Sequence, residues 1–335
     1  MNLQFDIREC QLNQIGRIQK FIHEEWKANH ILARDSSLMD WQYGTDNGYN
    51  FFVAESHKAL IGVLGFIPIS RFTGDKTERF FWLALWKVKD MPGVRGAGLL
   101  LLKALRQKYK KSDWGVVGIN RNHIGLYKSL GCETGLLKHY FITNRKINPS
   151  LIKVDKKKRP VASDGTAIFK QGVQSLSEGE EESIFAGYTP RKSCSYLRAR
   201  FENHPGYDYK IYTIIQDNKA HGFIVARVVK KGTTTVIRIV DFMGDCAILA
   251  HCGTAIQQLM EDEAAEYCDF LNHGVKTDPL HSAGFRTVDT DREIVPNFFE
   301  PFELANHQVH WAAYLQCRDT NLRIFRADGD QDRPN

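Results

Sequence analysis

The feature that most constrains the fold is a pattern of predicted elements that occurs twice along the 335-residue chain. In each half, strand-like runs are followed by a loop, a helix, another strand and a short helix. Landmark residues recur at a nearly constant spacing, since Asp90 corresponds to Asp245 and Gly131 to Gly284. A repeat of this length indicates a duplicated domain rather than a solenoid unit.

A lysine-rich segment separates the two halves. Residues 146–165 contain Pro149, Pro160 and the basic run from Lys153 to Arg159, a composition typical of a solvated linker. We therefore predict domains at residues 1–145 and 166–335. The predicted fold class is α/β, an α+β arrangement in which each domain has a central mixed sheet flanked by helices.

Composition excludes several classes of protein. The chain is 43% hydrophobic and 25% charged with a net charge of +6, which is typical of a soluble globular protein. Its longest apolar stretch, Ala59 to Ile69, is far shorter than the roughly 20 residues of a membrane span. The amino terminus has no signal-peptide pattern, and the seven cysteines form no CxxC pair. We predict a cytoplasmic protein with no metal ion and no membrane or nucleic-acid partner.

A glycine-rich loop between a strand and a helix, within residues 80–110, predicts an anion site. Glycines let the backbone approach a ligand closely, and the free amides at a helix amino end attract phosphate oxygens. Arg95 adds a charged donor. The loop has neither the Gly-Lys-Ser/Thr of a P-loop nor a GxGxxG pattern. The alternative is an ordinary strand-to-helix turn.

A second motif gives the loop a context. Residues 120–132 follow the next strand and read N-R-N-H-I-G-L-Y-K-S-L-G-C, with Asn120, Tyr127 and Gly131 at spacings of seven and four. Together with Arg95-x-x-Gly98-x and the order of elements, this makes the first half resemble the GNAT superfamily of acyl-CoA-dependent N-acyltransferases.

The sequence departs from the family pattern at three places. Leu100 stands where the loop motif usually ends in a small residue, Cys132 stands where Phe is usual, and Pro92-Gly93 lengthens the loop. These departures affect the expected geometry of pyrophosphate binding.

The resemblance implies an acyl-CoA co-substrate whose thioester is attacked directly by an amine. Two diverging strands, near Trp82–Val88 and Trp114–Asn120, would open a slot for the pantetheine arm. Tyr127 would protonate the departing thiolate, although the ring alternatively packs its own helix. Coenzyme contacts are expected from Lys87, Val88, Gly93, Val94, Arg95, Gly96, Ala97, Gly98, Asn120 and Tyr127.

The residue that deprotonates the amine is less well defined by the sequence. The family often uses a carboxylate or a water chain near the first helices. His30 and Asp35 lie in a short polar turn between two predicted helices, and we include both as catalytic candidates that contact the acceptor.

The second half lacks the motif residues. By the same spacing Tyr127 corresponds to Leu280 and Asn120 to His273, and the loop from Asp241 to Ala247 has one glycine and two acids. Carboxylates repel a pyrophosphate. We therefore predict that this half binds no coenzyme A and contributes to acceptor binding instead.

Tandem GNAT folds with one active half resemble two groups of enzymes. Residues 240–245, 296–302 and 328–335 are similar to the FdhC-type dTDP-amino-sugar N-acyltransferases, which implies a nucleotide-linked amino-deoxy sugar as partner, a 3-hydroxybutanoyl or acetyl donor and a role in O-antigen-type polysaccharide synthesis. Fem-type ligases and other transferases acting on a peptide or protein amine remain an alternative, as does a non-catalytic acyl-CoA or nucleic-acid binding module. The acceptor contacts implied by the sugar group are Trp82, Trp86, Asp241, Asp245, Asn297, Glu300 and Arg333.

Two of these assignments have simpler alternatives. Asp241 and Asp245 lie just before a predicted helix, where either would serve as a cap. Residues 328–335 have the composition of a solvated, frayed tail.

Overall fold

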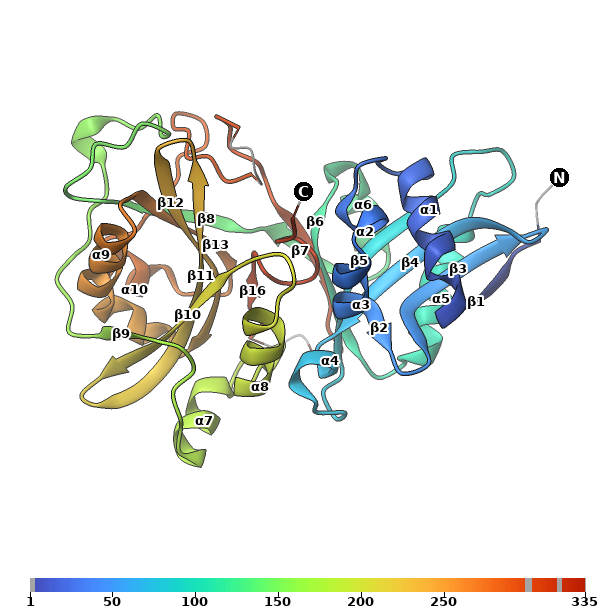
Figure 1. Cartoon of the computed structure of the whole chain (residues 1–335), viewed down its shortest axis with the longest axis horizontal. Coiled ribbons are helices and arrows are strands. Elements are labelled where there is room, and N and C mark those ends of the chain that lie inside the picture. The colour runs from blue at the N-terminus through green and yellow to red at the C-terminus, as the bar shows by residue number, and fades with distance from the viewer. Residues whose placement is uncertain (1–3, 299–302, 318–320, 335) are drawn as a thin grey trace.

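The computed structural model describes residues 4–298, 303–317 and 321–334. It consists of two lobes side by side, each built on one mixed sheet of eight strands (Figure 1). The two sheets confirm the predicted fold class.

The first sheet has the order β1-β3-β4-β5-β6-β15-β7, and β2 pairs with β3 at its side. Its strands are β1 (Asp6–Gln11), β2 (Gly44–Thr45), β3 (Gly48–Ser56), β4 (Ala59–Pro68), β5 (Phe80–Val88), β6 (Asp113–Ile119), β7 (Glu133–Leu136) and β15 (His310–Tyr314).

The second sheet has the order β9-β10-β11-β12-β13-β8-β14, and β16 pairs with β13. Its strands are β8 (Lys138–Thr143), β9 (Ile168–Gln171), β10 (Tyr209–Gln216), β11 (Lys219–Lys231), β12 (Thr234–Gly244), β13 (Ala265–His273), β14 (Arg286–Thr287) and β16 (Ile324–Phe325). Seven positions of the two sheets correspond one to one, and the pairs β5–β6 and β12–β13 are both parallel. The topology therefore supports the duplication.

One strand of each half completes the sheet of the other half. β8 precedes the linker in sequence but pairs with β13 and β14, whereas β15 comes near the end of the chain and inserts between β6 and β7. Sheet membership thus crosses the predicted domain boundaries, which remain a prediction. The pattern of a strand reveals its burial but not its partner.

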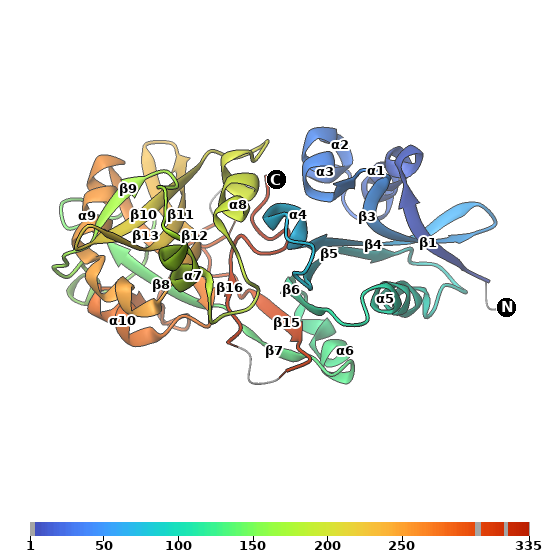
Figure 2. The ribbon, with the colours of Figure 1, turned by 90° about the horizontal axis from the view of Figure 1, so that it is seen from below.

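Helices cover both faces of each sheet. Figure 2 shows α1–α3 on one side of the first sheet and α5 and α6 on the other. The helices are α1 (Ile15–Glu25), α2 (Ile31–Arg34), α3 (Ser36–Tyr43), α4 (Ser70–Thr73), α5 (Ala97–Lys108), α6 (Ile124–Ser129), α7 (Glu178–Phe185), α8 (Cys194–Leu197), α9 (Gly253–Asp262) and α10 (Thr277–Ser282). Three short turns matter below: η2 (Arg121–His123), the π-helical η4 (Arg198–Glu202) and η5 (Cys246–His251).

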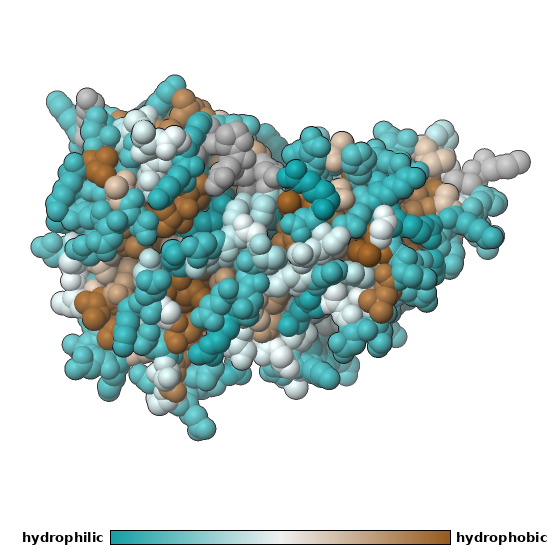
Figure 3. Space-filling view, viewed as in Figure 1, coloured by the Kyte–Doolittle hydropathy of each residue, from teal (hydrophilic) through white to brown (hydrophobic). Residues whose placement is uncertain are grey.

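The two lobes share a hydrophobic core. One buried cluster joins the α1–α3 side of the first sheet, including Tyr43 and Trp82, to the α7–α8 side of the second, including Tyr196 and Phe223. The outer face in Figure 3 is mainly hydrophilic with separate hydrophobic areas. Within the described ranges, no helix combines the length and apolar character that crossing a bilayer requires.

Candidate active site

The parallel strands β5 and β6 separate in the middle of the first sheet. Their pairing runs from Phe80 opposite Asp113 to Leu83 opposite Val116. Beyond Leu83, β5 holds one more residue than β4 between two successive partner positions, a β-bulge, while β6 continues to pair with β15 as far as Ile119. The carboxyl-terminal ends of β5 and β6 therefore diverge, and we call the space between them the first slot.

The glycine-rich loop connects the end of β5 to helix α5. Gly93 and Gly96 have φ values of 85° and 89°, which other residues adopt only at a cost. Gly96 precedes α5, and the Leu100 amide donates to its carbonyl at 3.0 Å. The Ala97 amide donates to the Val94 carbonyl at 3.1 Å. The Gly98 and Leu99 amides come before the Leu100 bond in the first turn, and amides in these positions suit an anion.

Gly98 in the first turn of α5 faces strand β5. A Cβ added at Gly98 would lie 3.2 Å from Nε1 of Trp86 and 3.5 Å from a methyl group of Val88. The missing side chain leaves the helix amino end open beside the first slot. These residues fit a pyrophosphate held by backbone amides.

Tyr127 projects from α6 toward the same slot. Its ring centroid lies 6.2 Å from that of Trp86 on β5 and 6.5 Å from that of Trp114 on β6. Burial raises the pKa of the Tyr127 hydroxyl well above its usual range, so the group keeps its proton at neutral pH. The Tyr127 ring is packed in the core, as expected if its role is to pack its own helix. Its position near Trp86 of β5 and Trp114 of β6 also suits the predicted role as the proton donor to the thiolate.

The two tryptophans assigned to the acceptor lie on opposite faces of the sheet. Trp82 is buried on the α1–α3 side, and Trp86 is half-buried on the α5 side against Gly98. The β-bulge between them shifts the alternation by one residue. Trp86 therefore fits a contact to the coenzyme rather than the predicted contact to the acceptor, whereas Trp82 keeps its predicted place. We call the α1–α3 side of the first sheet, where Trp82 lies and where the acceptor is predicted to bind, the acceptor side.

His30 lies buried on the acceptor side of the first sheet. Its Nδ1 accepts a hydrogen bond from the Leu32 amide at 3.2 Å, and burial lowers its pKa to about 4. The neutral ring therefore carries its proton on Nε2, a buried atom without a hydrogen-bond partner among the described residues. In this tautomer the free nitrogen of His30 is a hydrogen-bond donor, which does not suit the role of a base. The Asp35 carboxylate caps α3 by accepting from the Leu38 amide at 2.9 Å.

The end of the chain crosses from the second lobe to the first slot. Arg200 on η4 donates to the carbonyls of Ala327 and Gly329. A Cβ added at Gly329 would lie 3.7 Å from Cβ of Trp82, and the Gln331 side chain packs against Gly118 at the end of β6. We call residues 328–334 the tail strap.

The tail strap is not the solvated tail that composition allowed. Asp330 and Asp332 are only 7% and 1% exposed. Asp332 pairs with Arg227 at 3.0 Å and accepts from the Tyr209 hydroxyl at 2.8 Å. Arg333 pairs with Asp330 at 2.9 Å and remains partly exposed.

The corresponding slot of the second half is filled by the chain itself. Strands β12 and β13 pair from Thr235 to Ile239 and then separate. Strand β16 occupies the gap, pairing with the end of β13, and the Ala327 amide donates to the Val240 carbonyl. The Phe325 ring stacks on Phe270 with centroids 5.8 Å apart. We call residues 322–327 the plug.

A buried ion cluster fastens the plug. Lys192 lies 2.7 Å from a carboxylate oxygen of Asp241 and 3.1 Å from one of Asp328, and all three side chains are buried. Burial and the nearby Asp328 raise the pKa of Asp241 to about 7, against the opposing effect of Lys192. Neither Asp241 oxygen is accessible, so we remove Asp241 from the acceptor contacts.

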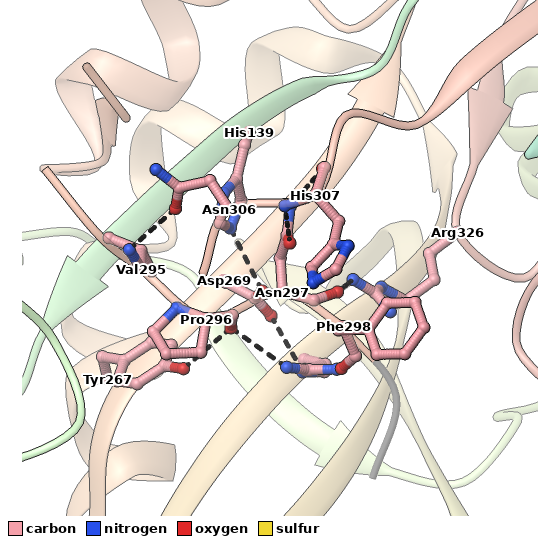
Figure 4. A network of polar contacts seen from close by, with 11 residues as sticks. His139, Tyr267, Asp269, Val295, Pro296, Asn297, Phe298, Asn306, His307 and Arg326 are labelled. Carbon is pink, nitrogen blue, oxygen red and sulfur yellow. Dashed lines mark hydrogen bonds and ion pairs between the residues drawn. The ribbon is translucent and has the colours of Figure 1, made fainter. Parts of the chain in front are cut away.

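The remaining predicted contacts have structural partners. Asp245 caps η5 by accepting from the Ala247 amide at 3.1 Å, and Asn120 caps η2 by accepting from the Asn122 amide at 2.9 Å. The Asn297 carboxamide bonds both backbone groups of His307, and Figure 4 shows this brace. Glu300 lies outside the described residues.

Comparisons with known proteins bear on the fold. No protein-family model and no curated protein sequence matches the chain. Among solved structures, the chain is similar to a GCN5-related N-acetyltransferase from Anabaena variabilis ATCC 29413, with a TM-score of 0.53 and 12% identity over 92% of this chain and 72% of that one. It is also similar to a putative acetyltransferase from Pyrococcus horikoshii, with a TM-score of 0.52 and 11% identity over 94% and 91% of the two chains.

A third similar structure is a conserved protein of unknown function from Enterococcus faecalis V583, described as a probable N-acyltransferase. It has a TM-score of 0.52 and 12% identity over 92% of this chain and 72% of that one. Each of the three alignments includes both lobes, because each spans more than nine-tenths of this chain. The chain therefore has the fold of two GNAT-like domains in tandem.

Proposed function

We propose that this protein is an acyl-CoA-dependent N-acyltransferase whose first half carries the reaction. The observation that supports this most is the first slot, where β5 and β6 diverge beside a glycine-rich helix start and a buried tyrosine. The second half contains a similar pair of strands but fills the gap with the plug.

The chemistry follows from groups that face the first slot. Beyond Leu83 the β5 backbone has no β6 partner, so its amides bind the pantetheine arm and polarise the thioester carbonyl. The first turn of α5 binds the pyrophosphate. Tyr127 gives its proton to the departing thiolate; the environment that raises its pKa also makes that thiolate more basic.

The acceptor in this proposal is the amino group of a nucleotide-linked amino-deoxy sugar, with dTDP as the nucleotide and an acetyl or 3-hydroxyacyl group as the acyl donor. The acceptor side of the first slot faces the second lobe, and the tail strap lies between them. The unpartnered His30 Nε2 and the partly exposed Arg333 suit sugar hydroxyls and phosphates.

Thiol release from acyl-CoAs tests the proposal. Acetyl-CoA and 3-hydroxybutanoyl-CoA are offered with a panel of nucleotide-linked amino sugars and, separately, with peptides that carry free amines. Release that requires an amino sugar supports the full proposal, and release only with peptides corrects the acceptor. No release with any amine, in a protein that binds coenzyme A, would leave the binding-module alternative.

Arg333→Gln is the variant that tests the acceptor contact. It should raise the acceptor KM and leave the acyl-CoA KM unchanged. Deleting the whole tail strap is a poorer test. The deletion would remove Asp328 and Asp332, which pair with the buried side chains of Lys192 and Arg227, and would therefore destabilise the protein.

A further inference from the structure

A small cavity lies where the end of β6 meets the second lobe. Its volume is about 170 Å³, and its lining includes Gly118 and Ile119 of β6, Arg326 and Gln331. The volume fits one phosphate or carboxylate group and excludes a whole nucleotide. Because β6 forms one side of the first slot, the cavity borders the acceptor side of the candidate active site.

The cavity carries a buried positive charge. Arg326 is 3% exposed, and its guanidinium donates to the Asn297 carbonyl (Figure 4). Within the described ranges, no carboxylate lies at ion-pair distance from Arg326, and no aspartate or glutamate lines the cavity.

The nearby acids already have other partners. Asp332 pairs with Arg227, and Asp269 accepts from His139 at 3.1 Å and lies 3.8 Å from Arg238. Burial and the neighbouring Arg238 lower the pKa of Arg326 to about 10, against the opposing effect of Asp269 and Asp332, so its charge persists at neutral pH. A buried cation without a counter-ion is costly, and an anion in the cavity would offset that cost.

We propose that this cavity binds a single anionic group, a phosphate or a carboxylate of the acceptor, through Arg326 and the carboxamide of Gln331. The assignment to the acceptor rests on the proposed function. The binding of an anion does not, because it can be measured without any acyl transfer.

The test compares thermal unfolding of the full chain in sodium phosphate, sodium acetate and sodium chloride at equal ionic strength. A bound anion should raise Tm in proportion to the logarithm of its concentration above Kd, by about 3 °C or more at 100 times Kd. A rise in Tm in phosphate alone identifies a phosphate site, and a rise in acetate alone identifies a carboxylate site. Equal Tm values in all three salts would overturn the proposal.

Two variants locate the effect. Gln331→Glu places a carboxylate beside Arg326 and should weaken the anion response at least about tenfold. Gln331→Met removes the carboxamide contact without adding a charge, so it should weaken the response less than Gln331→Glu does. Gly98→Asp blocks the other anion site at α5 and should leave the response unchanged. A response that Gln331→Glu leaves unchanged, or that Gly98→Asp abolishes, would place the anion elsewhere and overturn the assignment.

The outcomes separate this inference from the proposed function. Anion binding without acyl transfer to any amine would contradict the function and leave the cavity site standing. Acyl transfer without anion binding would contradict the cavity site alone.

Discussion

The first slot and its counterpart between β12 and β13 begin with the same parallel pairing and end differently. In the first, the strands part beside a glycine-rich helix start, and no other strand of the described residues pairs between them. In the second, the plug supplies the backbone and aromatic contacts that a ligand would otherwise make. A sheet that splits leaves unpaired edges, and a duplicated domain can satisfy them with its own chain once binding is lost.

The sharpest test of the difference is Tyr127→Phe, because the second half has Leu280 at the corresponding position. Loss of a general acid costs about 10²–10⁴ in kcat, and coenzyme affinity should change little. Steady-state thiol release measures the first and calorimetry the second. Tyr314→Phe is the matched control, since the Tyr314 ring also lies beside Trp114, with centroids 5.9 Å apart. Equal kcat values for Tyr127→Phe and wild type would remove Tyr127 from the reaction.

The plug is tested at its ion cluster. Lys192→Met leaves two buried carboxylates together and should lower the free energy of unfolding by about 3–5 kcal/mol. Asp328→Asn leaves the neutral Lys192–Asp241 pair and should cost less than about 1 kcal/mol. Urea unfolding followed by circular dichroism compares them. Similar losses in the two variants would mean that the cluster's charge balance does not fasten the plug.

Matched aspartates at the two helix starts compare the loops directly. Gly98→Asp places a carboxylate where the pyrophosphate is expected and should raise the Kd of coenzyme A by about 10–100-fold. Ala247→Asp, on the exposed start of η5, should leave the Kd unchanged. Calorimetric titration of both folded variants decides, and a normal Kd for Gly98→Asp would move the coenzyme away from α5.

The smallest expected effect concerns His30. Its folded pKa of about 4 lies below the unfolded value of about 6.5, so only the unfolded chain takes up the proton between these values. Stability is therefore unaffected above pH 6.5 and falls toward pH 4, by up to about 1.4 kcal/mol per pH unit.

His30→Asn, which retains a capping side chain, should make the loss of stability between pH 7 and pH 5 smaller, whereas the exposed His123→Asn should not. Some loss should remain, because burial also lowers the pKa values of His139, His204 and His273. Urea unfolding at pH 7 and pH 5 measures the difference. Parallel pH profiles for wild type and His30→Asn would show that His30 titrates normally.

Local patterns predicted the parts of the site that are continuous in sequence. The strand, loop and helix around Gly96, and the short helix bearing Tyr127, could be expected because periodicity and glycine positions are local properties. The β-bulge that separates Trp82 from Trp86 could not, because it depends on the register with β4.

The acidic tail shows where composition misleads. Asp328, Asp330 and Asp332 look solvated by residue type alone, yet each has a cation from a distant or nearby segment: Lys192, Arg333 and Arg227. Lys192 and Arg227 lie far from the tail in sequence, and strand periodicity carries no information on such partners. Lys192 and Arg326 had no signal in the sequence beyond their charge.

The exchange of strands also delays completion of the first sheet during synthesis, because β15 lies near the end of the second half. Among the described strands, β7 pairs with β15 alone. β15 emerges from the ribosome roughly 170 residues later, about 10–35 s at 5–20 residues per second. Until then the first sheet presents β6 and β7 as open edges to other nascent chains. We therefore expect the nascent chain to depend on chaperones during translation more than a chain whose sheets are each completed by consecutive strands.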